Sequence, residues 1–228
     1  MEIRRLSTVV GAREAQGLAV IIDVFRAFTT AAHVMANGAE RIIPVLTVEE
    51  SFRLKGLNPD WLQIGEDGGI RVEGFDYGNS PYLASLTDFT GRTVIQRTGA
   101  GTNGVVNARG AEERILGSFV MAEAIVKYIK RRAPDVVSLV AMGDVGVEPN
   151  EEDESCAEYI EGRLRGEKPD FNEMKRRIKA APSGAKFFDP SQPNFREEDF
   201  HLAMELDRFE FILRVEAAEV LNVVRVNA

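Results

Sequence analysis

Acidic, cationic and hydroxyl side chains that follow apolar, strand-like segments are the strongest chemical signal in this sequence. Asp23 closes the apolar residues 19–22, and Arg26, Thr29 and Thr30 follow within two turns of a predicted helix. The free N–H groups and positive dipole at the start of a helix favour an anion. This segment could therefore bring a carboxylate and a guanidinium together at an anion site. An Asp N-cap and a helix-surface Arg would explain the same spacing equally well.

Two further loops carry carboxylate, amide and hydroxyl groups. Residues 65–69, Gly-Glu-Asp-Gly-Gly, place Glu66 in a flexible segment after a short predicted strand. Taken alone, that composition is more typical of a turn than of a site. Residues 74–81 place Asn79 and Ser80 beside glycine, in a loop that could hold an oxyanion or a metal-bound water. Ser80 followed by proline also has the pattern of a helix N-cap with proline at N1.

A glycine-rich loop follows another predicted strand. Residues 97–104 read Arg-Thr-Gly-Ala-Gly-Thr-Asn-Gly and contain Arg97, Thr102, Asn103 and Gly104. A glycine-rich turn between a strand and a helix is a common setting for an anion-binding loop. The run is neither a Walker loop nor Gly-x-Gly-x-x-Gly, so it does not favour a nucleotide.

Acidic residues concentrate where a helix is predicted at 153–165. Glu152 and Asp153 lie there, between Glu151 and Glu154. Acidic side chains stabilise the first turn of any helix, so this composition alone is more typical of a structural role.

Most of these loops follow the carboxyl end of a predicted strand, where open α/β sheets form their ligand crevice. Their groups are carboxylates for a hard cation (Asp23, Glu66, Asp153), cations for anionic oxygens (Arg26, Arg97) and small donors (Thr29, Ser80, Thr102, Asn103). Mg²⁺ prefers oxygen ligands and keeps several of its waters. The combination therefore favours magnesium-assisted chemistry on a small phosphorylated acid.

The elements that must position these groups alternate between strand and helix. Strands are predicted at 18–24, 41–45, 61–64, 93–96, 114–116 and 136–142, with a terminal strand pair at 209–215 and 221–226. Helices are predicted at 26–37, 48–55, 104–109, 120–132, 153–165, 171–180 and 197–206, and a loop at 183–196. This alternation predicts an α/β fold with layered α/β/α architecture, whose strands are buried on both faces.

Composition bounds the class of protein. The chain has 228 residues, of which 44% are hydrophobic and 28% charged, as expected for one globular α/β domain over 1–228. The net charge of −8 disfavours nucleic acid as a partner. No apolar run approaches the roughly 20 residues of a membrane helix. A single cysteine, Cys156, and the lack of an apolar leader predict a cytoplasmic location, while homo-oligomerisation stays open.

Other catalytic schemes find little support. Two histidines, no His-Glu-x-x-His and no cysteine pair disfavour zinc. Gly-x-Ser-x-Gly is absent, which disfavours a serine-triad hydrolase. Cys156 lies among helix-patterned residues and is interpreted as a packed side chain.

The motifs resemble those of the 2-phosphosulfolactate phosphatase family. They occur in family order over about 20–162, and residues 198–207 show a weaker match. The matching segments are Val-Ile-Ile-Asp-Val-Phe-Arg-Ala-Phe-Thr-Thr from 20, Gly-Glu from 65, Gly-Phe-Asp-Tyr-Gly-Asn-Ser-Pro from 74, Thr-Asn-Gly from 102 and Glu-Asp-Glu-Ser-Cys-Ala from 152. Where the family usually shows Leu and Ser, this chain has Phe25 and Phe28.

The resemblance implies a Mg²⁺-dependent phosphatase that hydrolyses 2-phosphosulfolactate to sulfolactate and phosphate, a step of coenzyme M formation in methanogens. It also implies mixed sheets and two similar, intimately packed lobes, about 1–110 and 111–228. The positions carried over by motif are Asp23, Arg26, Glu66, Asn79, Ser80, Thr102, Asn103, Gly104, Glu152 and Asp153. We assign catalysis to Asp23, Arg26, Glu152 and Asp153, and metal binding to Asp23, Glu66 and Asp153. We assign substrate binding to Thr29, Thr30, Asn79, Ser80, Arg97, Thr102, Asn103 and Gly104. The planar fork of Arg97 would suit a sulfonate or carboxylate.

Two alternatives remain at this stage. The same scaffold could act on another phosphorylated hydroxy acid, or hold an anionic metabolite without catalysis. A scaffold protein that binds a basic partner through residues 151–154 ranks behind both.

Overall fold

A computed structural model describes residues 1–228. Its strands are β1 (Glu2–Ser7), β2 (Leu18–Ile22), β3 (Arg41–Val45), β4 (Leu62–Asp67), β5 (Ile70–Arg71), β6 (Thr93–Arg97), β7 (Glu113–Gly117), β8 (Val136–Ala141), β9 (Phe211–Glu216) and β10 (Asn222–Asn227). Its α-helices are α1 (Thr8–Glu14), α2 (Ala27–Ala36), α3 (Val48–Leu57), α4 (Pro81–Ser85), α5 (Gly101–Asn107), α6 (Ala122–Arg132), α7 (Glu151–Leu164), α8 (Phe171–Ala180), α9 (Pro182–Ala185) and α10 (Glu197–Ala203). Two 3₁₀ turns are η1 (Phe119–Met121) and η2 (Lys186–Phe188).

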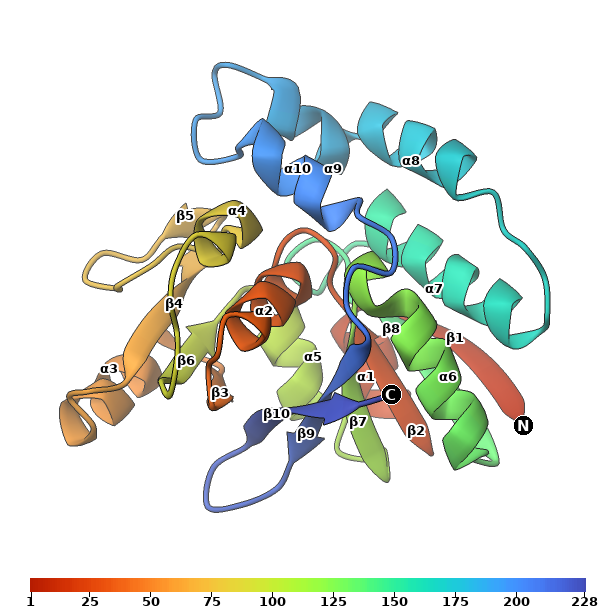
Figure 1. The fold of residues 1–228 in the computed structure, drawn as a ribbon, viewed down its shortest axis with the longest axis horizontal. Helices are drawn as coiled ribbons and strands as arrows, with labels where there is room; N and C mark the ends of the chain where they lie inside the picture. Colours follow the sequence, from red (N-terminus) through yellow and green to blue (C-terminus); the bar gives the residue numbers. More distant parts are fainter.

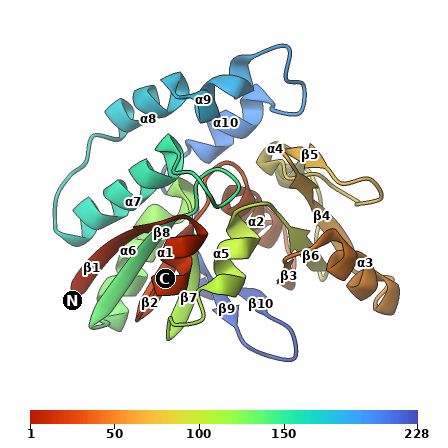
Figure 2. The ribbon, with the colours of Figure 1, turned by 180° about the vertical axis from the view of Figure 1, so that it is seen from behind.

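One mixed sheet runs through the molecule in the order β1-β8-β2-β7-β9-β10-β3-β6-β4-β5. Strands β1, β8, β2 and β7 form one parallel group, and β3, β6 and β4 form another. The antiparallel hairpin β9–β10 joins the two groups. Helix α6 covers one face (Figure 1), and α1 and α5 cover the other (Figure 2). The predicted layered α/β fold with a mixed sheet is confirmed.

The two expected lobes are not confirmed by the strand order. β2, from the first half of the chain, pairs with β7 and β8 from the second half. A single cluster of 54 buried apolar residues includes side chains from both parallel groups, such as Ile21 in β2 and Val94 in β6. The two groups therefore share one core.

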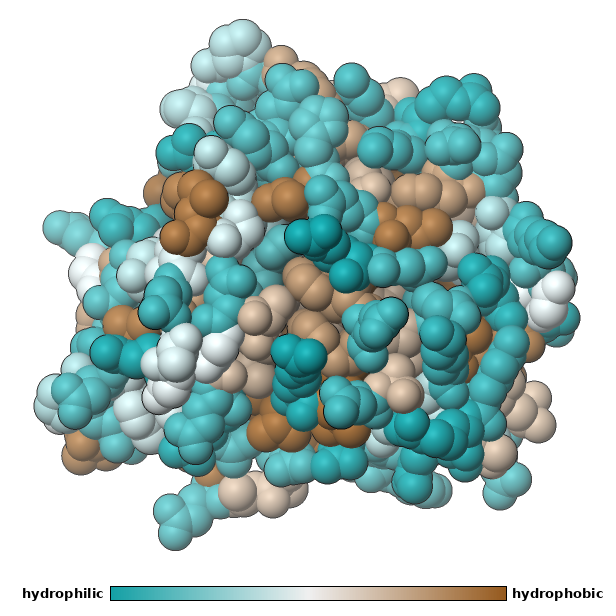
Figure 3. Space-filling view, in the orientation of Figure 1, coloured by the Kyte–Doolittle hydropathy of each residue, from teal (hydrophilic) through white to brown (hydrophobic).

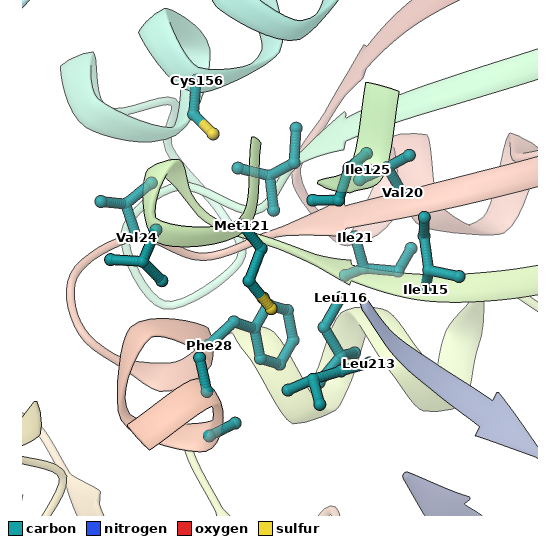
Figure 4. Close-up of a cluster of buried hydrophobic side chains, with 14 of the residues drawn as sticks. Val20, Ile21, Val24, Phe28, Ile115, Leu116, Met121, Ile125, Cys156 and Leu213 are labelled. Atoms are coloured by element: carbon teal, nitrogen blue, oxygen red, sulfur yellow. The ribbon is translucent and has the colours of Figure 1, made fainter. Parts of the chain in front are cut away.

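Strand β2 shows why an apolar run in the sequence predicted a buried strand. All five of its residues are buried, because helices cover both faces of a parallel sheet. Figure 4 shows Val20 and Ile21 of β2 packed near Ile115 of β7 and Ile125 of α6, with the Cys156 side chain at the edge of the cluster. Cys156 is fully buried, in agreement with its interpretation as a packed residue.

Most predicted elements are present, with shifted ends. β3 and α8 match their predicted bounds, and the terminal strand pair is the hairpin β9–β10. The prediction was wrong in placing all of 183–196 in a loop, because α9 and η2 occupy part of it. No element was predicted for β1 and α1. On the face drawn in Figure 3, hydrophilic side chains dominate and the hydrophobic patches are separated. No helix combines the length and apolar character needed to cross a membrane.

Helix α2 carries a buried titratable group, His33. Its ring packs edge-on against Phe209, with centroids 5.1 Å apart, and its Nε2 has no hydrogen-bond partner. Burial, together with the nearby positive charge of Arg208, lowers the pKa of His33 from 6.5 to about 4. The folded protein therefore keeps this ring neutral at pH values where the unfolded chain protonates it.

We expect His33 to make stability fall on mild acidification. The pKa of His33 is 6.5 in the unfolded chain and about 4 in the folded protein. Between these pH values only the unfolded state binds a proton, so the free energy of unfolding should fall by about 2 kcal/mol from pH 8 to pH 5. Urea unfolding of the wild type and of His33→Leu at both pH values measures this. The difference in free energy of unfolding between the wild type and His33→Leu should change by that amount between pH 8 and pH 5. The same difference at both pH values would contradict a lowered pKa for His33.

Candidate active site

A cleft of about 850 Å³ opens beside the carboxyl ends of β2, β4, β6 and β8. Asp23 follows β2, Glu66 lies near the end of β4, residues 98–100 follow β6, and residues 143–144 follow β8. Two of these strands belong to each parallel group, so both groups contribute to the lining. Residues 181–195 line a further side, and Figure 1 shows α9 and α10 lying above the start of α2. The predicted convergence of loops at the carboxyl ends of the strands is present.

Asp23 lies before α2 and close to the start of α5. Its Oδ1 accepts a hydrogen bond of 3.0 Å from the Ala27 N–H in α2, and a Cβ added to Gly101 in α5 would lie 2.8 Å from its Oδ2. Burial, together with the charge of Glu66, raises the pKa of Asp23 from 3.8 to about 6, although the hydrogen bond from Ala27 and the charge of Lys186 act in the opposite direction.

Glu66 ties two glycine-rich turns together. Its Oε1 accepts from the Gly99 N–H and its Oε2 from the Gly69 N–H, each at 2.6 Å. These charge-assisted bonds connect the β4–β5 hairpin to the loop before α5. Residues 65–69 therefore form a turn, as their composition suggested, and also deliver a carboxylate to the cleft.

Glu152 and Asp153 lie in the first turn of α7 and play different parts. Glu152 lines the cleft and accepts a hydrogen bond from the Ser183 hydroxyl. Burial, together with the negative charge of Asp23, raises its pKa from 4.5 to about 7. Asp153 does not line the cleft: its Oδ1 accepts from Val24 N–H at 2.8 Å and its Oδ2 from Gly143 N–H at 2.9 Å.

The four side chains Asp23, Glu66, Glu152 and Asp153 form what we term the carboxyl cluster. Burial, followed by the charges of Asp23 and Glu152, raises the pKa of Asp153 well above its usual value. Gathering these carboxyl groups opposes their ionisation, and a cation in the cleft would relieve that cost.

The donor chemistry of the cluster fits Mg²⁺. No group of three or more His, Cys, Asp or Glu side chains is arranged to hold a metal ion by itself. Mg²⁺ commonly needs only one or two carboxylates, with waters and substrate phosphate completing its shell. Asp23, Glu66 and Glu152 all line the cleft, and a carboxylate oxygen that accepts one hydrogen bond keeps a lone pair for a cation.

Arg26 anchors the far wall of the cleft. Its Nη1 donates to Asp199 Oδ2 and to the Asn194 carbonyl, both at 2.9 Å, and its Nη2 donates to the Gly69 carbonyl at 3.0 Å. Ser80 Oγ donates to the other oxygen of Asp199 at 2.6 Å. Asp199 is fully buried and lies 173 residues from Arg26 in sequence. Sequence reasoning missed it; the weak family match at 198–207 was its only signal.

Comparisons with known proteins identify the family. A family model described as 2-phosphosulpholactate phosphatase matches residues 6–217. The chain belongs to this family. A probable 2-phosphosulfolactate phosphatase of Bacillus subtilis (strain 168) is 33% identical over 211 residues, 91% of each chain. Proteins of the same description from Caldicellulosiruptor saccharolyticus and Carboxydothermus hydrogenoformans are 38% and 42% identical, over 55% and 52% of this chain and 53% and 49% of their own.

Family membership confirms the resemblance, and the structure brings part of its motif residues together. Asp23, Arg26, Glu66, Asn79 and Glu152 line the cleft. Asn79 is 5% exposed, and its Oδ1 has no hydrogen-bond partner. Ser80 caps α4 by accepting from the Leu83 N–H at 3.2 Å, as its sequence pattern predicted.

Three other residues that the sequence analysis assigned to substrate, Thr29, Thr30 and Arg97, do not line the cleft. Thr29 Oγ1 donates to the Val24 carbonyl at 2.8 Å, and Thr30 Oγ1 is buried without a partner. Arg97 donates to the carbonyl of Glu66 and, at 3.0 Å, to Asp67 Oδ1. A direct contact of these side chains with substrate stays a prediction.

The helix start at Thr102 serves the fold locally. Thr98 N–H donates to Thr102 Oγ1 at 3.1 Å, and Thr102 N–H donates to Thr98 Oγ1 at 3.2 Å. Asn103 Oδ1 accepts from Asn107 at 2.7 Å. A Cβ on Gly104 would lie 2.3 Å from the Met142 sulfur, so glycine there permits α5 to pack on the core.

The cleft is also lined by residues that the sequence did not indicate. Ser183, Lys186 and Phe195 line it from the segment predicted as a loop. No motif or periodicity marks them, because they reach the cleft only through the packing of residues 181–199 against the strands.

We expect the Arg26–Asp199 ion pair to be worth far more to stability than an exposed pair on the same helix. Asp199→Ala leaves the buried guanidinium without its counter-charge and should lower the free energy of unfolding by about 3–5 kcal/mol. The matched control is Glu197→Ala, whose carboxylate is 60% exposed beside His201 and should cost less than about 1 kcal/mol. Urea unfolding of both variants measures this, and equal losses would contradict a structural role for the pair.

Proposed function

We propose that the protein is a Mg²⁺-dependent phosphatase that hydrolyses 2-phosphosulfolactate to sulfolactate and phosphate. The carboxyl cluster carries the proposal, because three of its members line one cleft at the carboxyl ends of the strands. Membership of the 2-phosphosulpholactate phosphatase family, and the similarity to a probable 2-phosphosulfolactate phosphatase of Bacillus subtilis, support the substrate. A cytoplasmic location and any oligomeric state remain predictions from the sequence.

Asp23 would hold the Mg²⁺ together with Glu66 or Glu152. The ion, when bound, would supply positive charge to the phosphate oxygens. Phosphate monoesters are among the slowest groups to hydrolyse without a catalyst, so several electrostatic contributors are required. The high local density of carboxyl groups is therefore a requirement of the chemistry as well as a cost to the fold.

The chain's other residues position these groups. Asp153 accepts from the N–H groups that follow β2 and β8, which fixes the two loops relative to each other. Arg26 and Asp199 hold residues 181–199 against the β4–β5 turn, which closes one side of the cleft. Partial enclosure excludes water and strengthens charge interactions with a bound phosphate.

We expect the purified protein to release inorganic phosphate from 2-phosphosulfolactate only when Mg²⁺ is present. EDTA should abolish release and added Mg²⁺ should restore it, because the cleft offers too few cations of its own for the substrate's charges. A phosphate-release screen over phosphorylated hydroxy acids, with and without Mg²⁺, measures this. Preference for another hydroxy acid would correct the substrate alone.

Asp23→Asn should reduce turnover by about 100-fold or more while the chain stays folded. The control is Asp135→Asn, the same change at an exposed residue before the amino end of β8. Phosphate release that survives Asp23→Asn would remove this residue from the site. A protein that binds these acids but releases no phosphate from any of them would be a metabolite-binding protein instead.

A further inference from the structure

The cleft is lined by more acidic than cationic side chains, so a substrate with several negative charges needs additional cations in order to bind. Two cationic side chains line it, Arg26 and Lys186. The acidic residues that line it are Asp23, Glu66, Asp144, Glu148, Glu151 and Glu152. A substrate with a phosphate, a carboxylate and a sulfonate therefore meets an excess of like charge. A metal ion can compensate for the phosphate, but the other acid groups need their own partner.

Arg26 is not free to be that partner. Its guanidinium is 6% exposed and already donates to Asp199, to the Asn194 carbonyl and to the Gly69 carbonyl. Its charge is balanced by the fully buried carboxylate of Asp199. Arg97, which the sequence analysis assigned to the sulfonate or carboxylate, lies outside the lining and donates to Glu66 and Asp67.

Lys186, unlike Arg26, has no carboxylate partner. It takes part in none of the ion pairs of the structure. Its ammonium lies 4.5 Å from the centre of the Phe195 ring, and the Arg26 guanidinium lies 4.9 Å from the same ring. An aromatic face attracts an ammonium group without neutralising it. Lys186 thus keeps its charge available beside the cleft.

The Phe195 ring is itself fixed in place. It packs on Gly69, where an added Cβ would lie 2.5 Å from the ring's Cζ. Gly69 also has φ of +82° and donates its N–H to Glu66. The ring that supports Lys186 is thereby seated on the same turn that holds a member of the carboxyl cluster.

We propose that Lys186 binds an acid group of the substrate that stays on the carbon skeleton, the carboxylate or sulfonate next to the phosphate-bearing carbon. This inference rests on the proposed function and names the group that would recognise the acid. Such an acid lies only a few bonds from the phosphate, so its partner must lie close to the carboxyl cluster. Lys186 meets that condition, because it lines the same cleft as Asp23 and Glu152, and Ser183, three residues before it, donates a hydrogen bond to Glu152.

The test compares the binding of the two products of hydrolysis, sulfolactate and inorganic phosphate. Sulfolactate carries the carboxylate and sulfonate without phosphate, and inorganic phosphate carries neither acid. Isothermal titration with Mg²⁺ present gives the Kd of each for the wild type, Lys186→Met and Lys186→Arg. Lys186→Met should weaken sulfolactate binding by about tenfold or more and leave phosphate binding within about twofold, whereas Lys186→Arg should retain most of the sulfolactate affinity.

Lys179→Met is the matched control. The Lys179 ammonium also lies over an aromatic ring, 4.0 Å from the centre of Phe188, but Lys179 does not line the cleft. Lys179→Met removes the same charge and the same type of contact at a position outside the cleft. Its Kd values for sulfolactate and for inorganic phosphate should therefore match those of the wild type. Circular dichroism of each variant separates loss of binding from loss of folding.

The outcomes separate this inference from the proposed function. Unchanged sulfolactate binding in Lys186→Met, equal weakening of both ligands, or no sulfolactate binding by the wild type would overturn the role of Lys186. Phosphate release by the wild type in those cases would leave the phosphatase proposal standing. Sulfolactate binding that depends on Lys186, in a protein that releases no phosphate, would support the subsite and overturn the phosphatase proposal.

Discussion

The close burial of carboxyl groups is the constraint on which the rest of this structure depends. Ionised carboxylates repel one another and lose hydration when buried. The fold offsets this cost with backbone N–H groups: Asp23 accepts from Ala27, Glu66 from Gly69 and Gly99, and Asp153 from Val24 and Gly143. The cluster therefore fixes the loops that follow the strands within each parallel group, and three of its members line the cleft.

A second set of contacts places the segment 181–199 over that cleft. The buried pair of Arg26 and Asp199 joins α10 to the start of α2, and Phe195 packs on Gly69. Phe25 packs against Phe187 and Phe200 at ring distances of 4.8 and 5.5 Å. The aromatic side chain at this position thus adds apolar contact to the same junction and helps to seat the residues that carry Ser183 and Lys186.

Local sequence patterns predicted much of the fold because they arise from local burial. β2 was visible as an apolar run since both its faces are covered, and α8 was visible from its periodicity. β1 and α1 were missed. β1 is an edge strand with partly exposed, charged residues, which leaves no continuous apolar run to detect.

The candidate site was predictable only in part. Asp23, Glu66 and Glu152 were found because each follows or ends an element that the sequence reveals. Thr102 was assigned to substrate from a glycine-rich run, whereas its hydroxyl and N–H are paired with Thr98. Lys186 has no sequence signal, and Asp199 has only the weak family match, because the place of Asp199 is set by contacts with Arg26 and Ser80 across more than a hundred residues.

The most direct test of this account is thermal unfolding with and without Mg²⁺, because it detects the cluster's demand for a cation independently of catalysis. A ligand that binds only the folded state raises the Tm. The account predicts that Mg²⁺ raises the Tm of the wild type and of Asp135→Asn, and has little effect on Asp23→Asn. A Tm that does not respond to Mg²⁺, or that rises equally in Asp23→Asn, would contradict it.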